Sequence, residues 1–397
     1  MKSYLETQKK EDCFGCRACE LACPKKCIVM KENEEGFLYP SIDKSKCISC
    51  NKCLKVCPHT NSKENLFNAE VYAAQVKNKE ILMKSSSGGV FSELANYILD
   101  ADGVVFGTTM ENDKVEVISI TKKEDLNKLR GSKYVQSDTK NTYNEVKQLA
   151  DKNKLILYVG TPCQIAGLKK YLGKHYNNNI ITVDIICHGV PSQKFLKKYL
   201  NYMKDKYGYE KIELNFRDKS INKWSLTLKC TLTKKANIKT RYYTPQTSSY
   251  YYAFINALNY RESCYTCPFA KESREGDITI GDFWNLEEKK KNMFNWKNGI
   301  SIMMINSLKG KKVFEAIKSK IYYCSSDVEE AKKGNVQLSR PSERKKIRDI
   351  IYELLENMEY SEFEKKYLRS KKYSEYKIKS LIGIKLKKIR NKIRNKE

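Results

Sequence analysis

A cysteine pattern that occurs twice near the start of the chain constrains the fold more than any other feature of the sequence. The first copy is Cys13-x2-Cys16-x2-Cys19-x3-Cys23-Pro24, and the second is Cys47-x2-Cys50-x2-Cys53-x3-Cys57-Pro58. This spacing is typical of bacterial proteins that hold two 4Fe-4S clusters. The two-residue gaps let three thiolates converge on one cluster, while the fourth cysteine, stiffened by the proline after it, reaches the other cluster.

The crossing of the fourth cysteine predicts two ligand sets. The first set is Cys13, Cys16, Cys19 and Cys57, and the second is Cys47, Cys50, Cys53 and Cys23. The alternative is a zinc module with two CxxC knuckles, but a third and a fourth cysteine in phase in both copies favour clusters. Cys27 follows the first copy without belonging to it, and we expect it to pack against a cluster.

The remaining composition points to a cytoplasmic protein with metal or redox cysteines. The first residues contain no apolar signal segment, and no stretch approaches the roughly 18 apolar residues of a membrane span. In a reducing compartment the 15 cysteines are expected to serve as metal ligands or redox groups rather than as structural disulfides.

The chain divides into three parts. We expect a ferredoxin-type dicluster domain over residues 1–62, a polar linker around residues 60–65, a larger α/β domain over residues 68–345 and a helical basic tail over residues 346–397. In the large domain, β-rich runs alternate with helical periods, which indicates a mixed α/β fold. The predicted strands are residues 71–76, 103–109, 155–160, 180–187 and 300–305, and the predicted helices are residues 91–99, 164–172, 192–207 and 311–321. Residues 212–216, 225–232 and 239–243 are strands without intervening helices, which predicts an antiparallel insertion.

The charge is strongly positive and is concentrated at the end of the chain. Lys and Arg number 75 against 47 Asp and Glu, a net charge of +28, and residues 371–397 alone hold 11 of the basic residues. The near-helical mixture of lysine and isoleucine over residues 376–393 suits a peripheral contact with an anionic membrane or an acidic partner, or a solvated helix. No nucleic-acid module accompanies the charge, so we do not expect a nucleic-acid partner.

Two segments rich in serine and glycine are candidate cofactor loops. Residues 84–90 open a helix, and residues 129–137 form a cationic loop with several hydroxyl groups. Helix N-termini with glycines and serines suit a diphosphate, although a helix cap or a solvated turn that binds nothing fits equally well.

Four further cysteines suggest a third metal site. Cys163 and Cys187 each follow a predicted strand, at the edge where open α/β sheets bind ligands, and Cys264 and Cys267 form another CxxC before a proline. Together they supply enough ligands for a third cluster. The alternatives are a CxxC redox pair with two buried thiols, or a nucleophilic Cys163 or Cys187 activated by His188.

These motifs, in their order along the chain, resemble the coenzyme F(420) hydrogenase/dehydrogenase beta-subunit protein family in the form that carries an N-terminal dicluster domain. Besides the cysteine motifs, the resemblance rests on residues 85–89, 131–137, 160–164, 184–191, 215–219 and 277–284. Lys223 and Asn285 stand where the family often has glycine, so the sequence leaves open whether F(420) is used.

The resemblance implies a flavoprotein oxidoreductase that holds FAD beside iron–sulfur clusters. It implies that Ser86, Ser87, Gly88 and Gly89 hold the FAD diphosphate, that Ser132, Lys133 and Gln136 line the flavin pocket, and that Gly160 and Thr161 approach the flavin. It further implies that the third cluster is bound by Cys163, Cys187, Cys264 and Cys267. Arg217, Lys219, Asp282 and Trp284 match family motifs, but the sequence assigns them no role and names no catalytic residue.

The expected activity follows from this set of cofactors. The two dicluster centres take single electrons from ferredoxin or another redox partner subunit, and the third cluster relays them to FAD for oxidation or reduction of a small molecule. The alternative is an electron-transfer subunit without a substrate of its own, serving a partner oxidoreductase or a polysaccharide-biosynthesis pathway.

Overall fold

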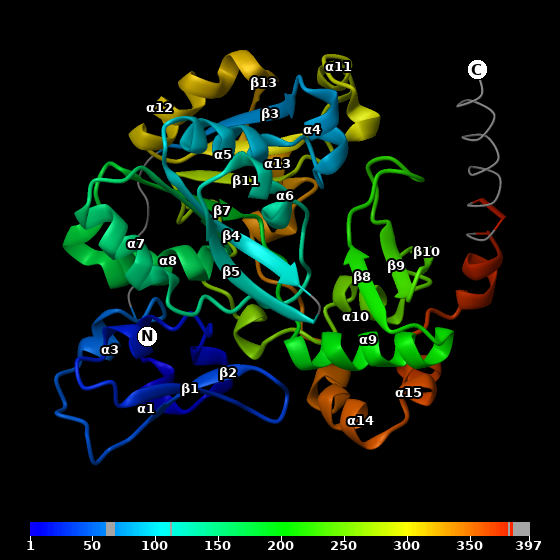
Figure 1. Cartoon of the computed structure of the whole chain (residues 1–397), viewed down its shortest axis with the longest axis horizontal. Helices are drawn as coiled ribbons and strands as arrows, with labels where there is room; N and C mark the ends of the chain where they lie inside the picture. Colours follow the sequence, from blue (N-terminus) through cyan, green and yellow to red (C-terminus); the bar gives the residue numbers. More distant parts are fainter. Residues whose placement is uncertain (61–67, 112, 380–381, 384–397) are drawn as a thin grey trace.

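The computed structural model describes residues 1–60, 68–111, 113–379 and 382–383 (Figure 1). The predicted linker lies largely outside these residues. The N-terminal module pairs β1 with β2 as an antiparallel hairpin, in which Ile28 lies opposite Ile42. Its elements are α1 (Tyr4–Thr7), α2 (Ala18–Ala22), β1 (Ile28–Glu32), β2 (Leu38–Ile42) and α3 (Lys52–Lys55).

An eight-stranded mixed sheet forms the centre of the main domain, in the order β13-β3-β12-β11-β7-β6-β4-β5. The strands are β3 (Glu70–Val76), β4 (Val104–Glu111), β5 (Lys114–Ile120), β6 (Ile156–Gly160), β7 (Ile180–Ile185), β11 (Ile278–Asp282), β12 (Ser301–Ile305) and β13 (Ile321–Ser326). The pairs β4–β6, β6–β7 and β7–β11 are parallel. The outer strands pair antiparallel, as in β11–β12 and β4–β5. The carboxyl ends of β6 and β7 therefore meet at one edge of the sheet.

Helices cover both faces of this sheet, which confirms the predicted mixed α/β fold (Figure 1). On one face, apolar residues of α5 and α12, including Leu94, Ile98 and Phe314, pack against the strands. On the other face, α7 and α8 contribute Tyr143 and Ile165. The helices of the main domain up to residue 172 are α4 (Lys79–Lys84), α5 (Val90–Asp100), α6 (Leu126–Leu129), α7 (Thr142–Asp151) and α8 (Pro162–Leu172).

The N-terminal module docks on the face that carries α7 and α8. Helix α2 packs against both of these helices, and Cys16 and Ala18 belong to the same apolar cluster as Tyr143 and Leu168. Figure 1 shows the module directly beneath α7 and α8. Part of the repeated cysteine motif is thus buried against the main domain.

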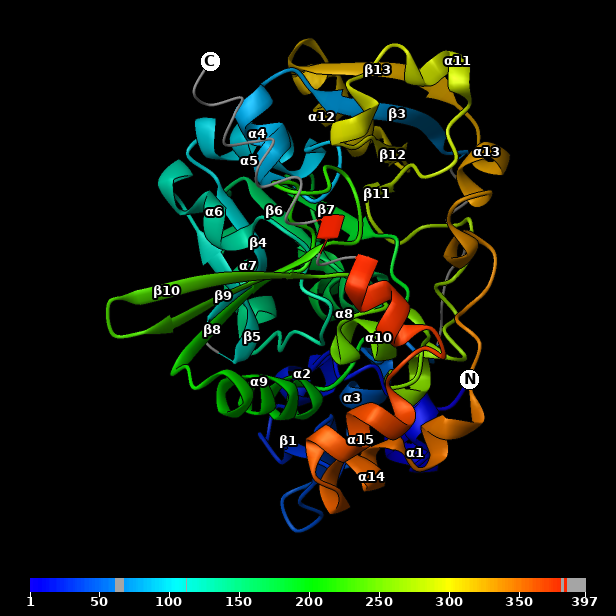
Figure 2. The ribbon, with the colours of Figure 1, turned by 90° about the vertical axis from the view of Figure 1, so that its right-hand side faces the viewer.

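The predicted antiparallel insertion is confirmed as a separate three-stranded sheet in the order β10-β9-β8 (Figure 2). Its strands are β8 (Lys211–Asn215), β9 (Leu228–Lys234) and β10 (Asn237–Tyr243), and its flanking helices are α9 (Gln193–Tyr207) and α10 (Ser249–Ile255). Aromatic side chains dominate the core beside it, with Tyr199, Tyr250, Tyr251 and Phe216 buried together.

The last part of the chain departs from the sequence prediction in the length of one helix and in the packing of the final helices into the core. The predicted helix 311–321 is wrong at its end, because α12 (Leu308–Ile317) stops before β13, which pairs with β3. Residues 346–368 form α14 (Ile351–Asn357) and α15 (Tyr360–Tyr367), which pack on α9 and bury Tyr352 and Phe363 (Figure 2). The short helices α11 (Glu288–Lys291) and α13 (Val328–Lys332) complete the domain.

The basic segment 376–393 lies mostly outside the described residues. Within the part of the chain that the structure describes, no helix has the length and the apolar character needed to cross a bilayer.

Candidate functional site

Two groups of thiols in the N-terminal module follow the spacing of the repeated motif. The inner group is Cys13, Cys16, Cys19 and Cys57, which line one small cavity. Burial raises the pKa of the Cys19 thiol, and the other three thiols of the inner group raise it further. These four side chains therefore lie close enough to act on one another.

The outer group is Cys23, Cys47, Cys50 and Cys53, which line a second cavity of about 210 Å³. Cys47 and Cys50 are exposed, whereas Cys53 is half-buried and lines both cavities. The outer group is thus the one nearer to solvent, and the two groups are neighbours.

The backbone repeats its geometry around the two groups. Gly15 and Arg17 in the first copy, and Ser49 and Asn51 in the second, all have left-handed φ angles between 51° and 69°. This conformation turns the N–H of Gly15 toward the Cys13 sulfur and the N–H of Ser49 toward the Cys47 sulfur, each at 3.4 Å. Main-chain donors aimed at thiolate sulfurs suit the anionic ligands of an iron–sulfur cluster.

A third group of thiols, Cys163, Cys187, Cys264 and Cys267, lies in the main domain. Cys163 stands in the first turn of α8 directly after β6, and Cys187 follows β7. Burial raises the pKa of the Cys264 thiol, and the other three thiols of the third group raise it further. Residues separated by 104 positions are thus brought together by the shared carboxyl edge of the parallel strands.

The inner and third groups are close neighbours. Burial raises the pKa of Cys16, and the thiols of Cys57, Cys13 and Cys163 add to that effect. At Gly167 of α8 a Cβ atom would lie 3.0 Å from the Cys16 sulfur, so glycine allows the helix to approach the module. The three groups therefore form a series from the protein surface to the edge of the main sheet.

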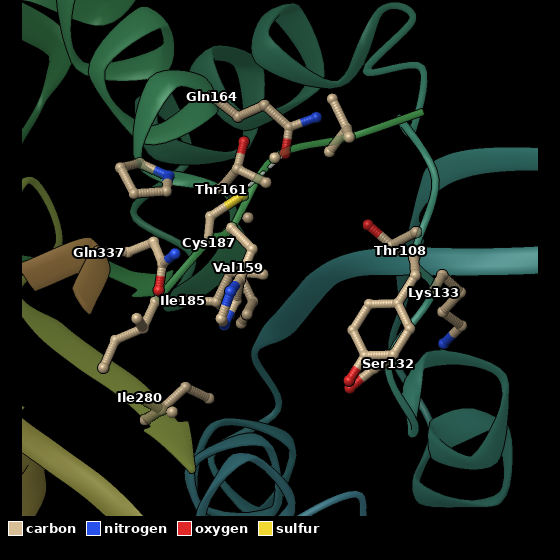
Figure 3. A pocket seen from close by; sticks show the side chains of 18 of the residues that line it. Thr108, Ser132, Lys133, Val159, Thr161, Gln164, Ile185, Cys187, Ile280 and Gln337 are labelled. Carbon is tan, nitrogen blue, oxygen red and sulfur yellow. Dashed lines mark hydrogen bonds between the residues drawn. The ribbon is translucent and has the colours of Figure 1, made fainter. Parts of the chain in front are cut away.

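A cavity of about 300 Å³, here called the main cavity, opens beside the third group. Of the residues predicted to contact a cofactor, those that line it are Ser86, Ser87, Gly89, Ser132, Lys133, Gln136, Gly160 and Thr161. Figure 3 shows Cys187 and Thr161 across the open space from Ser132 and Lys133. Ser86 joins the two predicted loops, since its Oγ accepts hydrogen bonds from the Ser132 N–H and hydroxyl at 2.8 and 3.0 Å.

Gly88 is not among the lining residues. Its N–H donates to Ser301 Oγ at 2.9 Å, and a Cβ atom there would meet the Ala74 carbonyl at 2.3 Å. The absence of a side chain at this position therefore serves the packing of the loop on β3 and β12.

Three of the lining residues also have structural partners within the chain. The Lys133 ammonium donates to the carbonyls of Leu129 and Arg130 at the end of α6, and burial lowers its pKa to about 7. Gln136 donates to the Phe14 carbonyl at 2.9 Å and so binds the N-terminal module. Thr161 caps α8, and its hydroxyl lies 3.1 Å from the Cys163 sulfur.

One wall of the main cavity contains Asp282 and Trp284 of the motif 277–284, to which the sequence assigns no role. Asp282 accepts two hydrogen bonds from Arg217, at 2.6 and 3.1 Å, and a third from the Trp224 indole N–H at 2.8 Å. Trp224 stacks on Trp284, with ring centroids 4.3 Å apart and planes 5° apart. This wall joins the three-stranded insertion to the main sheet.

The main cavity is rich in cationic groups. Arg130, Arg261 and Arg274 line it, whereas the lining carboxylate of Asp282 is held by Arg217. Burial alone would raise the pKa of Asp282, but the Arg217 guanidinium outweighs it and holds the pKa below its usual value. Serine hydroxyls, cations and a volume within the range of ligand pockets suit an anionic cofactor or substrate.

Among the described residues, no set of three or more His, Cys, Asp or Glu side chains is arranged around a single metal ion.

Comparisons with protein families cover most of the chain. Residues 71–142 match the N-terminal part of the coenzyme F420 hydrogenase/dehydrogenase beta subunit, and residues 153–331 match the C terminus of the same kind of protein. Two matches to a 4Fe-4S dicluster domain cover residues 12–61 and 39–90.

Two relatives and one solved structure are similar to parts of the chain. The chain is 26% identical over 227 residues to the F subunit of F(420)H(2) dehydrogenase from Methanosarcina mazei, an alignment that covers 54% of this chain and 62% of that relative. It is 33% identical over 66 residues to the VorC subunit of ketoisovalerate oxidoreductase from Methanothermobacter marburgensis, covering 16% of this chain and 84% of that relative. A chain of the F420-reducing NiFe hydrogenase complex from Methanosarcina barkeri aligns with a TM-score of 0.45 at 18% identity, covering 74% of this chain and 95% of that one.

Proposed function

The chain belongs to the coenzyme F420 hydrogenase/dehydrogenase beta-subunit protein family, and on that basis we propose that it is an iron–sulfur flavoprotein that exchanges electrons between a redox partner and a small-molecule substrate. Its N-terminal part is a 4Fe-4S dicluster domain of an oxidoreductase-family subunit. The observation that carries the proposal is the series of three thiol groups, which runs from exposed Cys47 to the main cavity.

In this proposal each group of four thiols holds one 4Fe-4S cluster. The inner and outer groups have the repeated motif and main-chain N–H donors 3.4 Å from a sulfur. The third group is formed by thiols at two strand ends and one CxxC, and it borders the main cavity. The Thr161 hydroxyl, 3.1 Å from the Cys163 sulfur, can donate to the thiolate ligand.

The main cavity is the proposed site of FAD. The hydroxyls of Ser86 and Ser132 and the guanidinium of Arg130 line the same space as the Lys133 side chain, and this donor set fits an anionic dinucleotide. Bound FAD supplies the exchange between single electrons and two-electron chemistry. The chain's own residues bind and orient it, and half-buried Ile185 and Val159 contribute apolar surface to the lining of the cavity.

Metal and flavin analysis of anaerobically purified protein tests this function. We expect about 12 Fe per chain from three four-iron clusters and about one FAD. The variant Cys163→Ser should lower the iron to about 8, while the matched control Cys324→Ser, on β13 and outside all three groups, should leave it unchanged. Unchanged iron in Cys163→Ser would remove the third cluster from the proposal, and full iron without flavin after reconstitution would remove FAD.

A second function is favoured by the names of the relatives, which are subunits of larger enzymes. In that case the chain passes electrons to a partner and has no substrate of its own. The two functions differ in one measurement, in which the isolated, reduced holoprotein is mixed with small-molecule acceptors. Reoxidation without a partner supports a substrate site, and its absence across acceptors supports the electron-transfer role.

A further inference from the structure

The outer cavity is lined by five thiols, one more than a 4Fe-4S cluster binds. The fifth is Cys27, whose sulfur lies 3.3 Å from the Cys23 sulfur. Cys27 also interacts with the thiol of Cys47, on the opposite segment of the outer group. Its side chain therefore points into the same space as the outer-group ligands, and it is only 5% exposed.

The backbone fixes Cys27 in this position from both sides. A turn closes after Cys23, where the N–H of Lys26 donates to the Cys23 carbonyl at 3.1 Å and Lys26 adopts a left-handed φ of 50°. On the other side, the Asp43 N–H donates to the Cys27 carbonyl at 2.8 Å. Cys23 and Cys27 thus present adjacent sulfurs from a short, hydrogen-bonded loop.

The repeated motif contains an internal comparison. Cys23 is followed four residues later by Cys27, whereas Cys57, the equivalent cysteine of the second copy, is followed four residues later by Asn61. The inner group therefore has no thiol in the corresponding sequence position. The two copies of the motif therefore differ in whether a thiol follows their fourth cysteine by four residues.

We propose that Cys27 is an alternative ligand of the outer 4Fe-4S cluster that exchanges with Cys23. The inference rests on the proposed function, because it requires the outer group to hold a cluster. In the exchange the iron bond to the Cys23 sulfur breaks and a bond to the Cys27 sulfur forms. The proton of the Cys27 thiol passes to the Cys23 sulfur, so neither the number of electrons nor the total charge changes.

The exchange gives the outer cluster a property that the inner cluster lacks. The outer group is the more exposed of the two, with Cys47 and Cys50 open to solvent. If one ligand is lost to oxidation or displacement, a second thiol already lies within 3.3 Å of it. The cluster can then keep four thiolate ligands and its place in the series.

Iron content and electron paramagnetic resonance of the reconstituted full-length protein test the proposal. We expect Cys23→Ala to keep the wild-type iron content, with an altered signal from one reduced cluster. We expect the double variant Cys23→Ala/Cys27→Ala to lose about four irons per chain. The matched control Cys57→Ala should by itself lose about four irons, because no thiol replaces it. Cys27→Ala alone should retain all the iron.

Loss of iron from Cys23→Ala equal to that from the double variant would overturn the proposal. Cys50 is an exposed thiol of the outer group. The variant Cys50→Ala therefore serves as the reference for a chain that has lost only the outer cluster and remains folded. A wild-type protein that takes up no iron under the same conditions would instead contradict the proposed function, so the two failures are distinguishable.

Discussion

The guanidinium of Arg261 donates a hydrogen bond from Nε to the main-chain carbonyl of Cys13 across 2.6 Å. Arg261 is 1% exposed, and it also binds the Leu38 carbonyl at 2.9 Å and Gln136 at 3.2 Å. Burial disfavours its charge, but attraction to Cys13, Tyr39 and Cys264 raises its pKa above the usual value. A buried cation therefore lies between the inner and the third thiol groups.

Replacing this cation should change the two neighbouring clusters selectively. A nearby positive charge favours the reduced form of an iron–sulfur cluster, so Arg261→Gln should lower the reduction potentials of the inner and third clusters. The outer cluster should shift less, as measured by anaerobic redox titration. Arg340→Gln, at an exposed position, is the control. Equal shifts of all three clusters, or none, would contradict this assignment.

The rim of the outer cavity should receive an acidic electron carrier. Lys25 and Lys52 line this cavity and are exposed beside Cys50. Lys25→Glu/Lys52→Glu should slow reduction by a ferredoxin about tenfold or more at low salt, and the difference should shrink as ionic strength rises. Stopped-flow kinetics measure this, with Lys235→Glu in the distant β9–β10 hairpin as control. Rates equal to wild type at low salt would place the docking surface elsewhere.

The C-terminal helices are held to the N-terminal module by a buried ion pair. Arg348 donates to both carboxylate oxygens of Glu35, at 2.7 and 3.0 Å, and is 1% exposed. Removing Arg348 leaves the Glu35 carboxylate buried without its partner. Arg348→Ala should therefore lower the free energy of unfolding, measured by urea titration, by about 3 kcal/mol. Arg344→Ala, which breaks a more exposed pair with Glu262, should cost less than about 1 kcal/mol. A similar loss of unfolding free energy in both variants would show that burial of the ion pair does not determine how much it stabilises the fold.

Lys223 occupies a backbone conformation that favours glycine. Its φ is 56°, and it stands directly before Trp224. Lys223→Gly should therefore stabilise the fold by up to about 1 kcal/mol, after allowance for the greater freedom of glycine in the unfolded chain. Thermal unfolding measures the change, and Lys197→Gly within α9 should destabilise instead. A lower melting temperature for Lys223→Gly would contradict the prediction.

Buried Lys219 should make stability depend on pH. Its ammonium donates to the carbonyls of Leu82 and Ser87 at 2.8 and 2.6 Å, and burial, with repulsion from Arg217, lowers its pKa to about 7. The unfolded chain keeps this proton to about pH 10.4, so it binds more protons than the folded chain between pH 7 and that value.

The free energy of unfolding should consequently rise with pH across that window, by up to about 1.4 kcal/mol per pH unit relative to Lys219→Met. Pulse proteolysis at pH 7 and pH 9.5 measures the difference, and exposed Lys235→Met should follow the wild type. Parallel curves for wild type and Lys219→Met would show that Lys219 keeps its usual pKa.

The predictability of the site follows from how far apart its residues lie in the sequence. Cysteines such as Cys13 and Cys16 belong to a local motif, so their spacing predicts both the module and the thiols beside them. Cys163 and Cys187 can be placed together because each closely follows a strand of the parallel part of the sheet. The main-domain strands were recognisable for the same reason, since buried parallel strands are continuous apolar runs.

Other contacts are not encoded locally. The stacking of Trp224 on Trp284 depends on how the insertion folds back on the sheet, and no short sequence pattern predicts this contact. Gly88 belongs to a predicted cofactor loop. In the structure, a Cβ atom at this position would meet the Ala74 carbonyl of β3. The sequence pattern assigns residues 346–368 to the basic tail, although Tyr352 and Phe363 are buried core residues.

The separation of the third-group ligands along the chain also sets an order of assembly. All eight thiols of the inner and outer groups have been synthesised once Cys57 is added to the chain, whereas the third group is complete only after Cys267. The dicluster module can therefore receive iron and sulfide during synthesis, before the main sheet exists. The third site must wait for β6 and β7 to pair, so its maturation is coupled to folding of the whole domain.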